Sequence, residues 1–223
     1  MRKNGREEDF KNLRDDMVDE QIIKRGIVDV RVISALRRVP RHKFVPQNQI
    51  DSAYEDMPIP AGEGQTISQP FIVALMTQSL KLQGDELILE IGTGTGYQTA
   101  ILSELCREVY SIERISKLAQ QAQEILDELN YRNVKIHVGD GTLGWPERIL
   151  FDAIMVTAAS PNRLEHLLKQ LNEKGRMVIP IGNQFGQKLT LIEKKNTEVK
   201  AQEICPCVFV PLIGEFGWKG RAF

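Results

Sequence analysis

The stretch Leu87-Ile-Leu-Glu-Ile-Gly-Thr-Gly-Thr-Gly-Tyr-Gln-Thr-Ala100 decides the fold of this chain. An apolar run typical of a strand ends in three alternating glycines, and a run compatible with a helix follows directly. Glycines at such a turn let the backbone pass close to a ligand and aim amide groups at it from the start of the helix. The stretch therefore predicts a strand, a tight turn and a helix that together bind a nucleotide-like cofactor.

Strand-like and helix-like runs alternate from this stretch onward. Strands are expected at residues 87–91, 109–113, 134–138, 152–157 and 176–181, with helices at 97–105, 116–129 and 161–171. Such alternation is typical of parallel strands joined by crossover helices. Two further strands, 189–194 and 204–211, have no helix between them and are expected to pair antiparallel. The predicted fold is α/β: a Rossmann-like, doubly wound, mostly parallel sheet with an antiparallel C-terminal strand pair.

The first third of the chain lacks this alternation. Residues 7–39 follow the periodicity of two amphipathic helices, residues 40–66 are rich in Pro and Gly, and a third helix is expected over residues 69–82. We expect one domain over residues 1–223. Within it, residues 1–83 form an N-terminal helical cap with an active-site segment, and residues 84–223 form the cofactor-binding core and the C-terminal strands.

The composition is that of an ordinary globular protein and excludes several classes of partner. Of the 223 residues 42% are hydrophobic and 26% are charged, and the formal net charge is -1, which gives no electrostatic reason to expect nucleic acid or an anionic membrane. No apolar run is long enough for a membrane span, and the charged N-terminus does not resemble a secretory signal. Three cysteines form no disulfide framework, and together with three histidines they suggest no metal site. We expect a reduced, cytoplasmic protein without a bound metal.

The spacing of the glycines distinguishes between two classes of cofactor. The dinucleotide fingerprint is Gly-x-Gly-x-x-Gly, but here the glycines alternate and Tyr97 stands at the position of the third one. A pyrophosphate cradle is therefore disfavoured, and an NAD-dependent dehydrogenase is kept as an alternative. The form Glu-x-Gly-x-Gly-x-Gly instead resembles motif I of the S-adenosylmethionine-dependent methyltransferases. That resemblance assigns the cofactor contacts to Glu90, Gly92, Thr93, Gly94 and Gly96.

Two acidic residues after the next strands fit the same cofactor. Glu113 ends the second strand, about 20 residues on, where a carboxylate accepts hydrogen bonds from ribose hydroxyl groups. This position does not separate NAD from S-adenosylmethionine, because both have a free ribose diol. Asp140, with Gly141, closes the third strand, where methyltransferases use an acid to accept a hydrogen bond from the adenine amino group. Each acid alone also fits an ordinary turn, but three such motifs in succession favour a methyltransferase.

The segment Gly62-Glu-Gly-Gln-Thr-Ile-Ser-Gln-Pro-Phe71 indicates what accepts the methyl group. It resembles the signature Gly-x-Gly-Gln-Thr-Ile-Ser-Gln-Pro of the protein-L-isoaspartate (D-aspartate) O-methyltransferases, class I enzymes that repair damaged aspartyl and asparaginyl sites. Other stretches are similar to that family's pattern: Val39–Pro46, Leu89–Ala100, Gly139–Gly141, Phe151–Ile154, Val156–Ala159 and Phe209–Leu212. A nitrogen acceptor is disfavoured, because Val156-Thr-Ala-Ala-Ser-Pro161 stands where such enzymes often have Asn/Asp-Pro-Pro-Tyr/Phe.

The resemblance implies a reaction and a set of site residues. A methyl group passes from S-adenosylmethionine to the α-carboxylate of an L-isoaspartyl residue, and the ester then cyclises to a succinimide. Ser68 matches the family's active-site serine, and Thr66 and Ile67 are expected beside the cofactor. Val208 and Val210 are expected to line the peptide cleft, where the backbone can pair with an extended substrate. An ordinary buried strand is the alternative for these two residues.

Physical reasoning gives Ser68 a role as well. It precedes the helix predicted from residue 69 and is of a type that caps helices. A capping serine keeps its proton free to donate, and a helix N-terminus favours a carboxylate by about 0.3–1 kcal/mol. That carboxylate is already ionised at neutral pH, so positioning and electrostatics should suffice for catalysis. We therefore assign no general base among the histidines, and we expect His42 on the surface.

Two other functions are left open by the sequence. One is an O-methyltransferase that acts on another carboxylate or on a small molecule, and the other is a non-catalytic S-adenosylmethionine-binding module for protein interactions. The expected partners are isoaspartyl-containing proteins and peptides. We expect a monomer, with self-association left open. The tail Gly214–Phe223 carries aromatic residues that should pack on the body or on another subunit.

Overall fold

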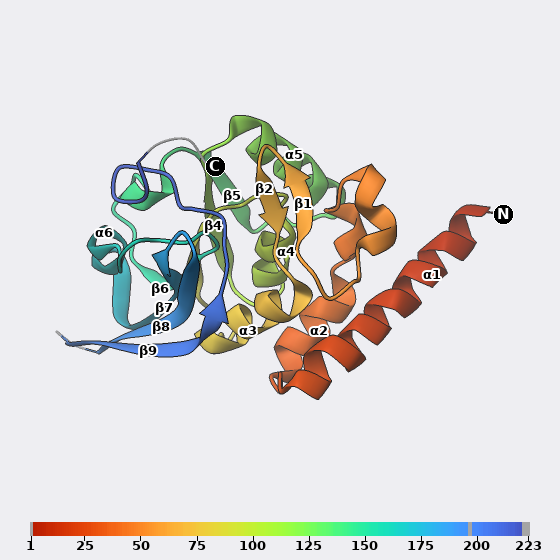
Figure 1. Ribbon diagram of the computed structural model, residues 1–223, viewed down its shortest axis with the longest axis horizontal. Coiled ribbons are helices and arrows are strands. Elements are labelled where there is room, and N and C mark those ends of the chain that lie inside the picture. Colours follow the sequence, from red (N-terminus) through yellow and green to blue (C-terminus); the bar gives the residue numbers. More distant parts are fainter. Residues whose placement is uncertain (1, 196–197, 220–223) are drawn as a thin grey trace.

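The computed structural model describes residues 2–195 and 198–219, and a seven-stranded sheet lies at its centre (Figure 1). The strand order is β5-β4-β3-β6-β7-β8-β9. The strands are β3 (Leu87–Ile91), β4 (Glu108–Glu113), β5 (Val134–Val138), β6 (Phe151–Val156), β7 (Leu171–Asn183), β8 (Gly186–Lys195) and β9 (Glu198–Cys207). The first five strands in this spatial order, β5, β4, β3, β6 and β7, run parallel to one another. Strand β8 is antiparallel to β7, and β9 is antiparallel to β8. The predicted fold class is confirmed.

The order of the strands reverses at β3. The chain leaves β3 for β4 and β5 on one side and then returns to place β6 on the other side. Ligands of open α/β sheets bind at such a switch point, outside the carboxyl ends of the strands. The loops after β3 and β6 are therefore the places where a site is expected.

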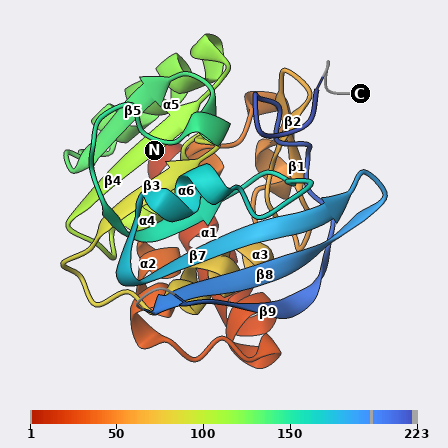
Figure 2. The ribbon, with the colours of Figure 1, turned by 90° about the vertical axis from the view of Figure 1, so that its left-hand side faces the viewer.

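Helices cover both faces of the sheet, and Figure 2 shows α6 in front of it. The first core cluster joins the cap with α3 (Pro70–Leu80), α4 (Tyr97–Ser103) and α5 (Ser116–Glu128), and the second includes α6 (Glu165–Lys169). Successive strand residues alternate between the clusters, as period two requires: Ile88 belongs to the first and Leu89 to the second. Both faces are buried, which explains the nearly continuous apolar runs of β3 and β6.

The predicted bounds of several elements in the C-terminal half are wrong. The strands expected over residues 176–181 and 189–194 are longer, because β7 begins at Leu171 and β8 at Gly186. The helix expected over residues 161–171 is only the five residues of α6, because Leu164 before it has φ 53°. The sheet takes over directly afterwards, since Leu171 already pairs with Phe151. The strand expected over residues 204–211 ends at Cys207 and begins much earlier, at Glu198.

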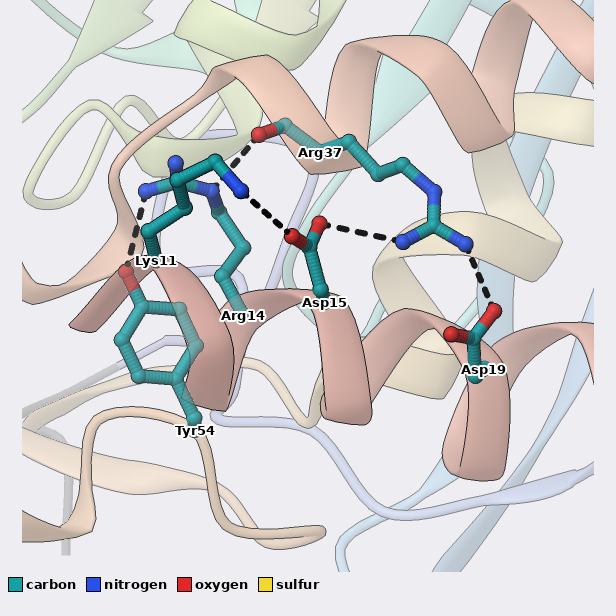
Figure 3. A network of polar contacts seen from close by, with 6 residues as sticks. All are labelled: Lys11, Arg14, Asp15, Asp19, Arg37 and Tyr54. Atoms are coloured by element: carbon teal, nitrogen blue, oxygen red, sulfur yellow. Dashed lines mark hydrogen bonds and ion pairs between the residues drawn. The ribbon is translucent and has the colours of Figure 1, made fainter. Parts of the chain in front are cut away.

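The N-terminal cap begins with α1 (Arg2–Asp16), which continues through a π-helical turn (Met17–Ile22) and a 3-10 turn (Ile23–Arg25), and α2 (Val30–Arg38) follows. Polar contacts hold α1 and its continuation to α2 (Figure 3). Arg37 reaches Asp15 at 3.0 Å and Asp19 at 2.6 Å, while Arg14 donates from Nε to the carbonyl oxygen of Arg37 at 2.6 Å. Two helices are present within residues 7–39 as predicted, although the first begins earlier and is only weakly amphipathic, with Leu13 46% exposed.

A β-hairpin lies at the end of the Pro- and Gly-rich segment, residues 40–66, for which no strand is expected. It is formed by β1 (Ile59–Gly62) and β2 (Gln65–Ile67), after 3-10 turns at Arg41–Lys43 and Gln47–Ser52. This hairpin carries the chain to Ser68, next to α3. None of the helices in the described ranges combines the length and apolar character that a membrane crossing needs.

Candidate active site

The glycine loop after β3 packs tightly at one end and is open in its middle. A Cβ atom on Gly92 would lie 2.3 Å from Thr157 Oγ1, so only glycine fits against the loop after β6. Gly94 has φ 56°, and a Cβ there would meet nothing within 4 Å. The backbone at Gly94 thus faces free space, which a ligand can occupy at the N-terminal end of α4.

Glu90 lies beneath this loop and is fully buried. Its Oε2 accepts hydrogen bonds from Thr99 Oγ1 at 2.5 Å and Ser111 Oγ at 2.6 Å, while Oε1 has no partner in the part of the chain that the structure describes. Thr93 Oγ1 lies 2.6 Å from the same Ser111 hydroxyl. Burial raises the pKa of Glu90 to about 7, since it disfavours the charged form. Glu90 and Thr93 therefore support the loop from inside the protein.

Glu113 at the end of β4 touches the open part of the loop. Its Oε2 accepts a hydrogen bond from the Gly94 amide and its Oε1 one from the Ile115 amide, both at 2.9 Å. Each carboxylate oxygen has a second lone pair for a further donor. The structure thus brings two of the predicted cofactor residues into direct contact.

Asp140 lies after β5 and organises the turn that follows. Its Oδ1 accepts from the amide and hydroxyl groups of Thr142, at 2.9 and 2.7 Å. Its Oδ2 accepts from the Glu215 amide at 2.7 Å, so the C-terminal tail reaches the predicted cofactor region. Gly141 is packed against β3, because a Cβ there would lie 2.5 Å from Ile91 Cγ2.

A cleft of about 220 Å³ brings together the residues predicted to act on the substrate and one, Thr66, that is predicted beside the cofactor. Thr66, Ser68, Val208 and Val210 all line it, with Thr157 and Gln69 among the other wall residues. Ile67 is buried in the first core cluster, between Thr66 and Ser68. The active-site segment and the residues after β9 therefore face each other across one cavity.

Ser68 does not cap α3, so that prediction is wrong. Gln69 is the N-cap residue, without a side-chain cap, because Pro70 occupies the first helical turn and holds the preceding residue extended (φ -51°, ψ 139°). Among the described residues we find no hydrogen bond partner for the Ser68 hydroxyl. That hydroxyl is thus free to bind a ligand in the cleft.

The segment after β9 is not the ordinary buried strand of the alternative interpretation. Val208 is 79% exposed. Val210 accepts a hydrogen bond at its carbonyl oxygen from the Ala159 amide, and Phe209 donates its amide to Gln187 Oε1, both at 2.8 Å. A substrate that pairs here as an added strand must use other backbone groups of this segment.

Sequence reasoning missed two residues that connect the parts of the site. Thr157 Oγ1 donates toward the carbonyl oxygens of Ile91 at 2.9 Å and Gly92 at 2.7 Å, and the same residue lines the cleft. Arg41 donates from Nη2 to the carbonyl oxygen of Ser68 at 2.9 Å. Both lie in stretches with family resemblance, Val156–Ala159 and Val39–Pro46, which was the only available signal.

The surface position expected for His42 is wrong. Its ring is buried, stacks on Phe10 at 4.1 Å between centroids, and places Nδ1 2.7 Å from the Tyr54 hydroxyl. Burial lowers the pKa of His42, because the imidazolium loses its hydration. The histidine belongs to the packing of the cap and does not line the cleft.

The described part of the tail, up to residue 219, packs on the body. The Phe216 ring stacks on His166 with centroids 3.7 Å apart, and Trp218 donates from Nε1 to the carbonyl oxygen of Ala159 at 3.2 Å. Residues 220–223 lie outside the described residues. Within the described ranges, no group of three or more His, Cys, Asp or Glu side chains is placed to hold a metal ion.

Comparisons with known proteins agree on one family. The family model "Protein-L-isoaspartate(D-aspartate) O-methyltransferase (PCMT)" matches residues 12–217. Protein-L-isoaspartate O-methyltransferase 1 of Syntrophobacter fumaroxidans is 51% identical over 211 residues, which are 95% of this chain and 99% of the relative. A relative of the same activity from Trichlorobacter lovleyi is 53% identical over 94% of this chain and 97% of its own length.

Solved structures agree with these relatives. A protein-L-isoaspartate O-methyltransferase superposes with a TM-score of 0.83 at 29% identity, over 92% of this chain and 67% of that chain. A putative enzyme of this kind from Plasmodium falciparum, solved in complex with S-adenosyl-L-homocysteine, gives a TM-score of 0.79 at 26% identity. That match covers 90% of this chain and 98% of the Plasmodium chain.

Proposed function

Since the chain belongs to the protein-L-isoaspartate(D-aspartate) O-methyltransferase family, we propose that the Gly92–Gly96 loop and the cleft at Ser68 are the two halves of its active site. The enzyme methylates isoaspartyl residues of damaged proteins with S-adenosylmethionine as the methyl donor. Family membership removes the dehydrogenase alternative. The assignment of individual residues is our proposal.

The residues around the loop fit S-adenosylmethionine. Gly94 leaves room for a ligand against the backbone, and Glu113 beside it has acceptor capacity left for ribose hydroxyl groups. We assign the adenine amino group to Asp140, whose Oδ2 accepts one hydrogen bond, from the Glu215 amide, and retains a lone pair. We further propose that Thr66 and Ile67 cover the bound cofactor. When bound, S-adenosylmethionine supplies an electrophilic methyl group on a positively charged sulfur.

Ser68 is proposed to orient the isoaspartyl carboxylate. Its hydroxyl has no described partner and lines the cleft, so it can donate to one carboxylate oxygen and leave the other to attack the methyl carbon. Ser68 also lies just before α3, whose first amides lack partners within the helix and favour an anion. A serine in this place can bind the carboxylate without removing its negative charge.

The observation that carries the proposal is the position of Thr157. It lines the substrate cleft, and its hydroxyl also contacts the carbonyl oxygen of Gly92 in the cofactor loop. The cleft and the loop therefore share a wall, so a carboxylate and a methyl donor bound in the two halves would be neighbours. Positioning of this kind can supply about 7–11 kcal/mol of a barrier.

The methyl transfer at this site needs no proton transfer. The carboxylate has an ordinary pKa near 4 and is ionised at neutral pH, so its oxygen can attack directly. The carbon–sulfur bond breaks as the oxygen–carbon bond forms, and S-adenosylhomocysteine leaves. The ester then cyclises spontaneously: the backbone amide nitrogen after the isoaspartyl residue loses its proton and attacks the ester carbonyl, and methoxide leaves and is protonated to methanol, which gives the succinimide. The described residues that line the cleft include no histidine.

Three further expectations are part of the proposal. A single domain is supported by the first core cluster, which includes Val32 and Leu36 of the cap with Ile88 and Val109 of the sheet. We propose a monomer, which light scattering after gel filtration would test. A cytoplasmic location is proposed as well, and cell fractionation would test it.

The decisive experiment compares an isoaspartyl peptide with its aspartyl twin. Methyl ester formed from labelled S-adenosylmethionine should appear on the isoaspartyl peptide alone. Equal labelling of the two peptides, or labelling of small molecules without peptide, would favour the broader O-methyltransferase. Ser68→Ala should lower kcat by about 10- to 100-fold and leave the affinity for S-adenosylhomocysteine nearly unchanged. An unchanged kcat would remove Ser68 from the site.

A further inference from the structure

Arg41 is a fully buried arginine without an acidic partner. Its side chain is 0% exposed, and it donates from Nε to the carbonyl oxygen of Ala53 at 2.8 Å and from Nη2 to that of Ser68 at 2.9 Å. The third nitrogen, Nη1, has no partner within the described residues. Arginine is effectively always charged, so the cap holds a cation that only neutral groups surround.

The same guanidinium also contacts the cofactor half of the site. It lies over the Tyr97 ring, with Cζ 4.7 Å from the ring centroid. The Phe44 ring meets the same ring edge-on, with the two centroids 5.7 Å apart. Tyr97 is the first residue of α4, directly after Gly96. Arg41 therefore connects the last turn of the glycine loop with the backbone of Ser68.

These contacts give a reason for the residue at position 97. A dinucleotide-binding loop has glycine there because the helix packs closely on the strand. Here the ring is 1% exposed and provides the π face on which the cation rests. The substitution that separates this loop from the dinucleotide fingerprint is thus also the residue that anchors Arg41.

A buried cation carries a free-energy penalty, because the charge loses its hydration. Here two carbonyl oxygens and one aromatic ring offset that penalty in part. A hydrocarbon side chain of similar size would fill the same volume without the penalty. A hydrocarbon, however, would hold neither the Ser68 carbonyl nor a fixed distance to Tyr97.

We propose that Arg41 is a positioning residue, which fixes Ser68 against the cofactor loop by bridging the Ser68 carbonyl oxygen and the Tyr97 ring. The proposal rests on the role assigned to Ser68 in the reaction. Arg41 touches neither the methyl donor nor the carboxylate. It acts on the distance between them, so its loss should affect kcat more than either binding constant.

Two pairs of variants test this. Arg41→Met removes the charge and the donors, whereas Arg41→Lys keeps a charge with a less suitable geometry. Tyr97→Leu removes the π face, whereas Tyr97→Phe keeps it and removes only the hydroxyl, for which the described residues offer no well-formed hydrogen bond. Arg14→Lys is the matched control, since Arg14 also donates to a backbone carbonyl of the cap but not to that of Ser68 (Figure 3).

For each variant, kcat and KM for the isoaspartyl peptide are measured together with calorimetric binding of S-adenosylhomocysteine. The binding stoichiometry counts folded sites, so kcat is expressed per site. We expect a fall in kcat of about 10- to 100-fold for Arg41→Met and Tyr97→Leu, a smaller fall for Arg41→Lys, and little change for Tyr97→Phe and Arg14→Lys. S-adenosylhomocysteine affinity should change much less than kcat.

The possible results separate this inference from the proposed function. A wild-type enzyme that makes no ester on the isoaspartyl peptide would overturn the function. A wild-type enzyme that does so, with unchanged kcat per site in Arg41→Met, would overturn the positioning role alone. If neither Arg41 variant folds, the tyrosine pair decides, and equal kcat values for Tyr97→Leu and Tyr97→Phe would contradict the bridge.

Discussion

The Thr157 hydroxyl lies 2.7 Å from the carbonyl oxygen of Gly92, and the space that a side chain on Gly92 would need is filled by that hydroxyl. The two residues come from the loops after β6 and β3, which flank the switch point of the sheet. Contact between them fixes the glycine loop relative to the substrate cleft. The shape of the cofactor site and the position of the cleft wall are thus set together.

Gly92→Ala should damage both stability and cofactor binding. The new Cβ would lie 2.3 Å from Thr157 Oγ1, and φ 101° is a region that L-residues rarely adopt. Backbone strain of this kind costs on the order of 1–3 kcal/mol. We expect a lower midpoint of thermal unfolding and a clear loss of S-adenosylhomocysteine affinity, measured by calorimetric binding.

A double-mutant cycle with Thr157→Ala isolates the contact. Thr157→Ala removes the hydroxyl, so the added Cβ clashes less and Gly92→Ala should cost less stability in that background. Gly186→Ala is the control, because a Cβ there meets nothing within 4 Å. Equal costs of Gly92→Ala with and without the Thr157 hydroxyl would contradict the steric argument.

Glu90 should make the fold more stable in mild acid. Its folded pKa of about 7 exceeds the ordinary 4.5, so the folded state binds the proton more tightly than the unfolded state. This contribution is fully present below about pH 4.5 and is lost as the pH rises through about 7. The loss amounts to about 3 kcal/mol at most.

Glu90→Gln tests this effect, because the amide is always neutral. Urea unfolding of both proteins should show that the variant gains stability relative to the wild type between about pH 5 and pH 8. Glu124→Gln serves as a control for the loss of one carboxylate. Glu124 lies on the exposed side of α5 and accepts a hydrogen bond from Gln120, one turn earlier in the same helix. A constant difference between wild type and Glu90→Gln across this range would mean that Glu90 is ionised throughout.

The strands of the core could be predicted from sequence because both of their faces are buried. The bounds predicted for the central strand β3 are those observed. The edge strand β9 has no such pattern, since its residues from Glu198 to Glu203 are all exposed and mostly polar, and its start depends on pairing with β8. The end of α6 likewise depends on the pairing of Leu171 with Phe151, a tertiary contact that local periodicity does not contain.

Several of the predicted site residues lie together in the structure, but the hydrogen bonds that join the parts of the site could not be predicted from the sequence. Ser68, Val208 and Val210 line one cleft, in agreement with the resemblance of their motifs. Arg41 acts on a backbone carbonyl 27 residues away, and Thr157 on one 65 residues away. Backbone carbonyls are the same at every position, so no residue type in the sequence marks such a contact.

His42 should give the opposite pH dependence to Glu90. Burial lowers its folded pKa below the ordinary 6.5, so the folded state binds the proton less tightly than the unfolded state. The stability it contributes is complete above about pH 6.5 and is lost as the pH falls through the folded pKa. The loss of stability between about pH 7 and pH 5 should therefore be smaller in His42→Gln than in the wild type.

The measurement is urea unfolding across that range. His166→Gln is the control, because His166 is a second histidine that stacks on a phenylalanine, here Phe216. Identical pH slopes for the wild type and His42→Gln would show that the imidazole has the same pKa in the folded and the unfolded state, which would contradict the argument from burial.

Val208→Glu should weaken peptide binding without affecting the cofactor half of the site. Val208 lines the cleft and is 79% exposed, so a carboxylate fits there without disturbing the core. Its negative charge would repel the isoaspartyl carboxylate, and we expect KM for the peptide to rise several-fold, because one exposed charge pair contributes up to about 1 kcal/mol. The effect should shrink in high salt, which screens exposed charges. Val199→Glu adds the same charge near the start of β9, at a residue that does not line the cleft, and should leave KM unchanged. Equal KM values for these two variants would place the peptide elsewhere on the protein, whereas a change in S-adenosylhomocysteine affinity for Val208→Glu alone would mean that the cofactor itself extends into this cleft.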